Sequence, residues 1–417
     1  MKIMVAAQIF APQGEGGAEM SARMVSLELQ ERHEVVVLSL GRPGDSIAPV
    51  GETFYDGIRI IRIPFNAVYL PGPDRPNSGL LTKALWHAQT ALGAVDEREV
   101  SRILERENPD LIYAQNTARM QPALWQAAHA MDVPVVQHLR DYGLLCAKGT
   151  MFRRGSNCVR RCAECRLLTK RIVPASKDVA TVIAVSDFVR RRYVSYEMFA
   201  AAKWHTMHNT NTPASKFHPG AVHRISHLDG RETDTITIGY LGTLSKAKGV
   251  EEIISSFARL PGNRARLVIG GRGSEDYVRK LKEMSAHYPI EFLGQVPAHH
   301  VYERADVIVS GSRWHEPQSR VLVEAAVYGV PVIATDRGGS PEIVVDNQTG
   351  WVYDPDCPDA LYEALRRIVD MGKRAWCQER NRLFPGLRDF KGTAEDSKIY
   401  ERLESIFAET LARHTRG

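Results

Sequence analysis

The feature that most constrains this chain is a repeated alternation between short apolar runs and amphipathic stretches. In the first half, the apolar runs are KIMVAAQ, HEVVVLSL, DLIYAQN, VPVVQHL and VATVIAVS, with stretches of helical spacing between them. Strands that are buried on both faces read as continuous β-branched runs, and connecting helices make such strands parallel. The pattern therefore predicts an α/β fold with a parallel sheet covered by helices.

The same alternation begins again after a polar stretch rich in His, Pro and Gly. The second series contains TITIGYLGTL, ARLVIGG, IEFLGQV, ADVIVSGS and VPVIATD. A chain of 417 residues is too long for one ordinary core. We therefore predict two doubly wound, Rossmann-like domains, residues 1–212 and 235–393, joined by a linker at 213–234. Two such domains imply a cleft, with ligands at the carboxyl ends of the strands.

The chain has no sequence feature of a membrane-inserted or exported protein. It contains no apolar stretch of about 18 residues, so no membrane-spanning helix is predicted. The N-terminus, MKIMVAAQIFAPQGEGG, lacks the charged first region of a signal peptide and runs directly into patterned sequence. We expect it to form the first strand, which favours a cytoplasmic location.

Two glutamates stand eight positions apart in HEPQSRVLVEAAVYGVPVIATD. Glu316 precedes a helix expected to begin near Ser319 and to end at Gly329, and Glu324 lies in its second turn. Helical side chains lean toward the N-terminus, so both carboxylates can face the helix start, where free N–H groups favour an anion. A sugar nucleotide would suit this arrangement. The alternative is an ion pair between Glu324 and Arg320, in the weaker of the two orientations.

The longer stretch SRWHEPQSRVLVEAAVYGVPVIATDRGGSPEIVVDNQTGWVYDP resembles the signature region of the family-4 retaining glycosyltransferases, with Glu316 and Glu324 as its Glu-x7-Glu pair. GYLGTLSKAKG, LVIGGRG and FLGQV follow the family's order and spacing, and APQGEGGAE resembles its N-terminal glycine loop. This resemblance covers most of the chain. It implies the GT-B fold, two Rossmann-like domains facing across a cleft, and a last helix, about 394–417, that crosses back onto the N-terminal domain.

The resemblance also implies roles for individual residues. Glu316 would bind hydroxyls of the donor sugar, Glu324 would accept from the ribose hydroxyls, and Lys248 would stabilise the leaving diphosphate. The other implied donor contacts are Gly16 and Gly17 in the N-terminal loop, Gly271, Gly273 and Val296 around the base, and the backbone N–H groups of Ser319, Arg320, Val321 and Leu322 on the diphosphate.

This chain departs from the family pattern at two places beside the implied diphosphate. Thr243 stands where an arginine is common, so one cation is missing, and Gln318–Ser319 stands where Phe-Gly is common. The second change leaves the backbone contacts intact and affects the donor-sugar contacts. The cations that could replace the missing one are Arg272, Lys246 and Arg320.

The implied chemistry needs no cofactor. No Asp-x-Asp element stands at a suitable place, and GT-B relatives generally need no divalent ion. Lys248 and the helix N-terminus would meet the charge on the departing diphosphate. Relatives retain the anomeric configuration and use the leaving phosphate to help deprotonate the acceptor, so we assign no separate general base. His138, Arg140 and Asp141 are candidate acceptor-side residues, although His138 could equally be a satisfied histidine at a strand end.

Four of the six cysteines, Cys146, Cys158, Cys162 and Cys165, lie within 20 residues. Four such thiols can make a tetrahedral structural zinc site, which in a cytosolic chain is a more common use than disulfides. Free or redox-active thiols and an iron–sulfur centre are the alternatives. The spacing of the last three cysteines also resembles the cluster motif of radical-SAM enzymes. That interpretation needs a (β/α) barrel, which the pattern of strands and helices does not predict. A subset of the resembled family carries a similar insertion, here at about 142–176.

Positive charge is concentrated in residues 138–224, which contain 16 basic and five acidic residues in a chain of net charge +5. Such a concentration favours an anionic partner, with a solvated basic face as the alternative. The expected partners are a UDP- or GDP-sugar donor, a glycan or lipid-linked acceptor, and an anionic membrane surface. Nucleic acid is not expected, because no recognition helix or RNA-binding motif is present.

The sequence therefore predicts a retaining hexosyltransferase that moves a sugar from a nucleotide-diphosphate sugar to a hydroxyl of a glycan, lipid-linked or other glycoconjugate acceptor. A nucleotide-sugar 2-epimerase or a sugar phosphorylase would use the same fold, but the Glu-x7-Glu spacing together with the Lys-Gly loop favours transfer. A non-enzymatic zinc module that binds nucleic acid would explain the basic segment but not the second domain.

Overall fold

The computed structural model describes residues 1–13, 17–67, 79–209, 234–262, 264–387 and 392–415. The chain divides into two compact units. The first consists of residues 1–151, 158–209 and 397–417, and the second of residues 152–157 and 210–396. The predicted linker at 213–234 lies, except for its last residue, outside the described residues.

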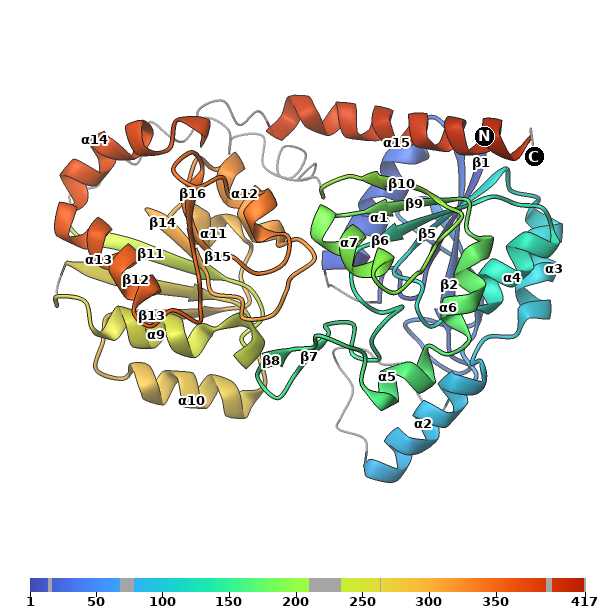
Figure 1. The fold of residues 1–417 in the computed structure, drawn as a ribbon, viewed down its shortest axis with the longest axis horizontal. Coiled ribbons are helices and arrows are strands. Elements are labelled where there is room, and N and C mark those ends of the chain that lie inside the picture. The colour runs from blue at the N-terminus through green and yellow to red at the C-terminus, as the bar shows by residue number, and fades with distance from the viewer. Residues whose placement is uncertain (14–16, 68–78, 210–233, 263, 388–391, 416–417) are drawn as a thin grey trace. The chain divides into compact units, whose positions relative to one another are not determined.

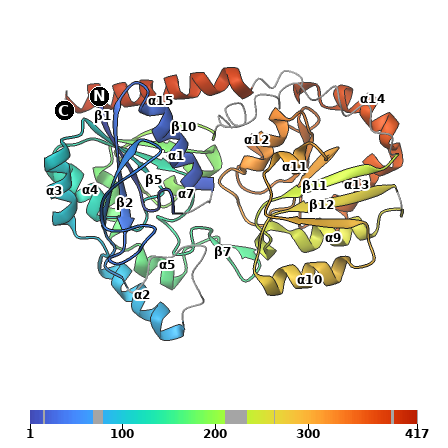
Figure 2. The ribbon, with the colours of Figure 1, turned by 180° about the vertical axis from the view of Figure 1, so that it is seen from behind.

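The first unit is built on an eight-stranded sheet with the order β10-β9-β6-β5-β1-β2-β4-β3 (Figures 1 and 2). Its strands are β1 (Lys2–Ala7), β2 (Glu34–Gly41), β3 (Gly51–Tyr55), β4 (Ile58–Pro64), β5 (Leu111–Gln115), β6 (Val135–Leu139), β9 (Thr181–Ala184) and β10 (Lys203–Thr206). All neighbours pair in parallel except β3 and β4, which form a hairpin. Asp56 and Gly57 make its turn with positive φ, the conformation that two-residue hairpins require.

Helices cover this sheet and close its core. They are α1 (Gly17–Leu29), α2 (Leu80–Leu92), α3 (Glu97–Glu107), α4 (Ala123–Ala130), α5 (Ala163–Leu168), α6 (Ile172–Ala175), η1 (Ser176–Asp178), α7 (Asp187–Val194) and α15 (Gly392–His414). From Ser397 onward α15 belongs to this unit, where Phe407 packs edge-on against Tyr113 of β5 with ring centres 5.1 Å apart. The end of the chain thus contributes to the core of the first unit, as the resemblance implies.

The second unit contains a six-stranded parallel sheet with the order β13-β12-β11-β14-β15-β16. Its strands are β11 (Ile236–Leu241), β12 (Ala265–Gly270), β13 (Ile290–Gly294), β14 (Val307–Ser310), β15 (Val332–Thr335) and β16 (Gly350–Tyr353). Successive strands run outward in one direction from β11 and in the other from β14. This reversal is a topological switch point, where the strand ends leave a crevice for ligands.

The helices of the second unit connect and cover these strands. They are η3 (Lys246–Lys248), α9 (Val250–Ala258), α10 (Glu275–Ser285), α11 (His299–Tyr302), α12 (Arg320–Val327), η4 (Ser340–Glu342), α13 (Ala360–Met371), α14 (Lys373–Leu383) and η5 (Pro385–Leu387). The unit also contains a small hairpin of two strands, β7 (Phe152–Arg153) and β8 (Ser156–Asn157). Both sheets confirm the predicted α/β class with two Rossmann-like domains. Within the described residues, no helix is both long and apolar enough to cross a membrane.

Candidate functional site

The switch point of the second sheet brings Lys248 and Glu316 together. Lys248 ends η3, the short turn after β11, and Glu316 lies in the loop after β14. The Lys248 Nζ lies 2.5 Å from Glu316 Oε1 and 5.9 Å from the centre of the Trp314 ring. Glu316 is only 4% exposed, and the hydroxyls of Ser312 and Ser319 also hydrogen-bond to it. Burial alone raises the pKa of Glu316, but the Lys248 charge and these hydrogen bonds outweigh burial and hold it below its usual value.

The loop that carries Glu316 is fixed by contacts on both sides. The Asn157 amide, from the small hairpin of the same unit, donates to the Arg313 carbonyl and accepts from the His315 N–H, both at 2.8 Å. Gly338 has a φ of +64°, and a Cβ there would lie 2.0 Å from the Glu316 carbonyl oxygen, so only glycine fits. The loop is therefore set in place before any ligand arrives.

Glu324 lies on α12, as predicted, and its two carboxylate oxygens have different neighbours. Oε2 accepts a hydrogen bond of 2.7 Å from the Tyr302 phenol, and Oε1 lies 3.4 Å from the Arg320 Nε. The predicted ion pair with Arg320 is thus present, but both side chains are about one-fifth exposed. A pair of this kind stabilises the fold by about 0.5 kcal/mol, too little to explain a carboxylate among apolar neighbours.

The start of α12 has free backbone donors. Ser319 occupies the N-cap position, but its side chain makes no capping hydrogen bond, since its hydroxyl bonds to Glu316 instead. Of the residues predicted here, Gln318 and Leu322 are buried, and Arg320 and Val321 are partly buried. The helix has eight residues, and its first N–H groups are available to an anion.

The other predicted donor residues lie on loops of the same sheet or in the first unit. Gly271 and Gly273 follow β12, Thr243 follows β11 and accepts a hydrogen bond from the Tyr240 phenol, and Val296 follows β13. Gly271 has a φ of +143°, and a Cβ there would overlap the Gly242 carbonyl, so this glycine is required by packing alone. Arg272 is exposed. Gly17 begins α1 in the first unit, and Gly16 lies outside the described residues.

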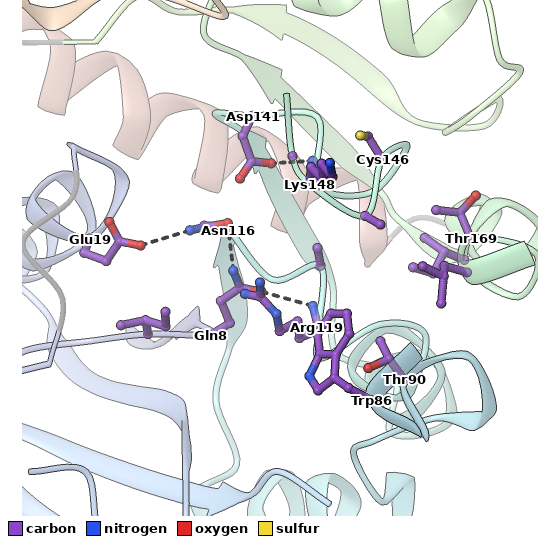
Figure 3. A pocket seen from close by; sticks show the side chains of 17 residues that line it. Gln8, Glu19, Trp86, Thr90, Asn116, Arg119, Asp141, Cys146, Lys148 and Thr169 are labelled. Atoms are coloured by element: carbon purple, nitrogen blue, oxygen red, sulfur yellow. Dashed lines mark hydrogen bonds between the residues drawn. The ribbon is translucent and has the colours of Figure 1, made fainter. Parts of the chain in front are cut away.

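The first unit contains a cavity of about 380 Å³ at the carboxyl ends of β1, β5 and β6 (Figure 3). Gln8 and Asn116 follow the first two of these strands, and their side-chain amides hydrogen-bond to each other at 3.2 Å. The Arg119 N–H donates to Gln8, and Asn116 donates to Glu19. The polar wall is therefore oriented by its own hydrogen bonds, and the Trp86 ring with the Arg119 guanidinium over it completes the cavity.

Asp141, predicted on the acceptor side, lies just beyond β6 and lines this cavity. Figure 3 shows it on the same wall as Asn116. Its Oδ1 accepts a hydrogen bond of 2.7 Å from the Gly143 N–H. Burial raises the pKa of Asp141 to about 6, because the backbone hydrogen bond and the Arg119 charge compensate only in part.

The other two predicted acceptor-side residues, His138 and Arg140, do not line this cavity. His138 is 1% exposed on β6, its Nδ1 lies 2.6 Å from the Tyr113 hydroxyl, and burial lowers its pKa well below the usual value. Burial keeps its ring neutral, but among the described residues its Nε2 is buried without a hydrogen-bond partner, so the interpretation as a satisfied histidine holds only for Nδ1. Arg140 donates to the Gln115 side chain at 2.9 Å and contacts Asn209.

The structure gives the predicted zinc site at the cysteine cluster no support. Across the described residues, which include all four of these cysteines, no group of three or more His, Cys, Asp or Glu side chains is placed to hold a metal ion. Cys146 and Cys165 are buried and hydrogen-bonded to each other, whereas Cys158 and Cys162 are partly exposed. The bond between them lowers the pKa of Cys146 and raises that of Cys165. Cys165 is also hydrogen-bonded to Cys162, so three of the four thiols are in contact.

Comparison with known proteins identifies the family. Residues 16–210 match the family described as "Glycosyl transferase 4-like domain", and residues 226–383 match "Glycosyl transferases group 1". The chain is a glycosyltransferase, with a group 1 domain at residues 226–383. An uncharacterised 42.6 kDa protein of the cps region of Klebsiella pneumoniae is 25% identical to this glycosyltransferase over 82% of this chain and 87% of that protein. A putative glycosyltransferase of Bacillus subtilis is 31% identical over 46% of this chain and 51% of its own.

Solved structures confirm the GT-B fold. Sucrose-phosphate synthase from Thermosynechococcus elongatus superposes with a TM-score of 0.72 at 17% identity, over 99% of each chain. Anabaena HepE, solved with UDP, has a TM-score of 0.63 at 20% identity, over 99% of this glycosyltransferase and 100% of that chain. The predictions of a GT-B glycosyltransferase that uses a nucleotide sugar are thus confirmed, and retention fits the family. The alternative of an epimerase or phosphorylase is not favoured.

Sequence reasoning missed two residues that the structure brings to this site. Tyr302 stands on a helix of four residues, too short to show a periodic pattern. Asn157 is separated from its partners by more than 150 residues and lies in a stretch singled out for its cysteines and arginines. Neither had a local signal, because both act through tertiary contacts.

Proposed function

We propose that this glycosyltransferase moves a hexose from a UDP- or GDP-sugar, with retention, to a hydroxyl of a glycan or lipid-linked acceptor. The observation that supports this most directly is the set of Lys248, Glu316 and Glu324 around the start of α12, at the switch point of a parallel sheet. Few structural roles require a buried carboxylate paired with a partly exposed lysine beside free helix N–H groups. A nucleotide-diphosphate sugar would use all of these groups: the diphosphate would contact Lys248 and the helix N–H groups, the sugar Glu316, and the ribose Glu324.

The ion pair suggests how the donor is received. In the ligand-free chain, Lys248 neutralises Glu316. When a donor binds, its diphosphate would become a second partner for the Lys248 ammonium, and Glu316 could then accept hydrogen bonds from sugar hydroxyls. The exchange keeps each buried charge paired, which avoids the large cost of an isolated charge in the interior.

In the transfer step, the bond between the sugar C1 and the β-phosphate oxygen breaks, and the nucleoside diphosphate leaves. The acceptor oxygen bonds to C1 on the same face, and its proton passes to the departing phosphate. Lys248 and the N–H groups at the start of α12 stabilise the charge that develops on that phosphate, and because they are already oriented they cost no reorganisation. No metal ion and no separate general base take part in this scheme.

We place the acceptor at the cavity of the first unit. Its volume of about 380 Å³ falls in the range of small-molecule sites. The amides of Gln8 and Asn116, together with Asp141 and Glu19, offer the alternating donors and acceptors that sugar hydroxyls need. Within this proposal, Asp141 accepts a hydrogen bond from the acceptor hydroxyl.

A thermal-shift panel with UDP-glucose, GDP-mannose and ADP-glucose tests the donor. A ligand that binds only the folded state adds about 2.7 kcal/mol at 100 times its Kd, which raises Tm by several degrees. We expect a shift with one or two donors and a clearly smaller one in Glu324→Ala. A folded wild-type protein that shows no shift with any of the three would contradict the proposal. A rearranged nucleotide sugar formed without acceptor would instead support the epimerase.

A further inference from the structure

Glu324 has an unusual environment for a residue proposed to bind ribose hydroxyls, because one of its two oxygens is already in use. The Tyr302 phenol donates to Oε2 at 2.7 Å, and Oε1 is the oxygen near Arg320, at 3.4 Å. A ribose diol needs an acceptor oxygen held in a fixed direction. A glutamate has three rotatable bonds, so a second contact that fixes its carboxylate lowers the entropy lost when a ligand binds.

Tyr302 is itself held rigidly. It is 1% exposed, and its ring stacks on Tyr328 at 5.0 Å with an interplanar angle of 28°. It shares one apolar cluster with Leu322 and Ala325, which flank Glu324 on α12. The packing of the Tyr302 ring and of α12 therefore holds the phenol oxygen in place beside Glu324.

The phenol also remains a donor at every physiological pH. Burial raises the pKa of Tyr302 well above its usual value, and the neighbouring Glu324 carboxylate raises it further. A neutral phenol beside a carboxylate gives a charge-assisted hydrogen bond, which is stronger than one between two neutral groups.

We propose that Tyr302 is a positioning residue for the nucleotide: it holds Glu324 Oε2 so that Oε1 is presented to the ribose hydroxyls. This inference rests on the proposed function, since it assigns Glu324 to the ribose. Tyr302 touches no reacting atom and acts only through Glu324. The hydrogen bond should therefore matter for affinity and leave the maximal rate nearly unchanged.

A double-mutant cycle tests this role. The proteins are the wild type, Tyr302→Phe, Glu324→Ala and the double variant, and the probe is UDP or GDP, whichever the wild type binds, measured by titration calorimetry. Tyr302→Phe removes only the hydroxyl, and we expect it to bind about tenfold more weakly, as for loss of a hydrogen bond to a charged group. In the Glu324→Ala background, the same change should cause no further loss, because the phenol then has nothing to position.

A matched control is Tyr288→Phe, a phenol that is 41% exposed in the same unit, which should bind like the wild type. With nucleotide sugar and acceptor, Tyr302→Phe should raise the donor KM about tenfold and leave kcat within twofold. Tyr302→Phe keeps the packed ring, so its fold should be preserved, and a thermal melt of each variant checks this.

Each outcome bears on a distinct claim. Equal affinity in the wild type and Tyr302→Phe, or a further loss in the double variant relative to Glu324→Ala, overturns the positioning role alone. A folded wild type that binds no nucleotide overturns the proposed function and this inference with it. A tenfold loss that disappears in the Glu324→Ala background supports both.

Discussion

The Glu316 carboxylate is buried and depends on one partially exposed lysine for its charge balance. Replacing Lys248 by alanine leaves that charge without its cation, and we expect the free energy of unfolding at pH 7.5 to fall by about 3 kcal/mol. Lys246→Ala, two positions earlier in η3, should change it little. Urea denaturation of the two variants makes the comparison.

The pH dependence of this effect follows from the direction of the shift. The folded pKa of Glu316 lies below its unfolded value, so its contribution to stability is present above about pH 4.3 and is lost as pH falls through the folded pKa. The difference between the wild type and Lys248→Ala should therefore shrink in acid. A difference that stays constant from pH 7.5 to pH 3.5 would mean that Lys248 stabilises the fold by packing alone.

The contribution of Asp141 to stability should depend on pH in the opposite way to that of Glu316. Its folded pKa of about 6 lies above the unfolded value, so this carboxylate destabilises the fold, fully above pH 6 and not at all well below pH 4. Asp141→Asn keeps the Gly143 hydrogen bond through its own oxygen, and should raise the free energy of unfolding at pH 7.5 by about 2 kcal/mol.

The same substitution tests the acceptor site. If Asp141 accepts a hydrogen bond from the acceptor hydroxyl, the wild-type kcat/KM for acceptor should rise with pH through about 6. Asp141→Asn should lose both this rise with pH and most of the activity. Donor affinity should not change. An unaltered pH profile in an active Asp141→Asn protein would place the acceptor elsewhere.

At the scale of elements, sequence patterns predicted the strands and helices that depend on local residues. The buried strands were visible because two-sided burial requires unbroken apolar runs. The helix α12 was visible because the stretch PQSRVLVEAAVYGV has helical spacing. The pairing of Lys248 with Glu316 was not predicted, since two loops separated by 68 residues meet only once the sheet is assembled. The cysteine spacing allowed a zinc tetrahedron, and the structure brings Cys146, Cys162 and Cys165 into contact.

The hairpin β7–β8 is an element whose role only the structure reveals. Its Asn157 bridges the Arg313 carbonyl and the His315 N–H, directly before Glu316. Asn157→Ala should weaken nucleotide-sugar binding about fivefold and lower Tm slightly, because two hydrogen bonds of about 1 kcal/mol each are lost from the loop. Calorimetry and thermal melting measure both effects.

Two further variants define the contact. Ser156→Ala changes an exposed neighbour in the same hairpin and should bind donor like the wild type. Asn157→Asp keeps the acceptor for the His315 N–H but loses the donor to the Arg313 carbonyl, so its affinity should lie between those of the wild type and Asn157→Ala. Wild-type affinity in Asn157→Ala would show that the other contacts hold the loop without the hairpin.

At the scale of the whole molecule, the distribution of charge matters more than its sum. Residues 138–224 carry 16 basic and five acidic side chains, so the rest of the chain is acidic overall.

Within the first unit, α2 contacts α5, and both helices have exposed leucines: Leu81, Leu85 and Leu167. Leu81 and Leu85 are four residues apart and lie on one face of α2. Apolar side chains among basic residues suit an anionic bilayer, which attracts each nearby Lys or Arg by about 1 kcal/mol.

We therefore expect the protein to co-sediment with phosphatidylglycerol vesicles at low salt, and not with phosphatidylcholine vesicles. Raising the salt should release it, since screening weakens the attraction of basic residues to the surface. Leu81→Ser combined with Leu85→Ser should reduce the bound fraction several-fold, because the leucines contribute by burying apolar area. The control is Phe54→Ser, a side chain that is 71% exposed on β3 of the same unit and should leave binding unchanged. Equal loss in both variants would indicate unspecific hydrophobic adsorption, and binding that is indifferent to salt and to lipid charge would contradict an electrostatic role for the basic segment.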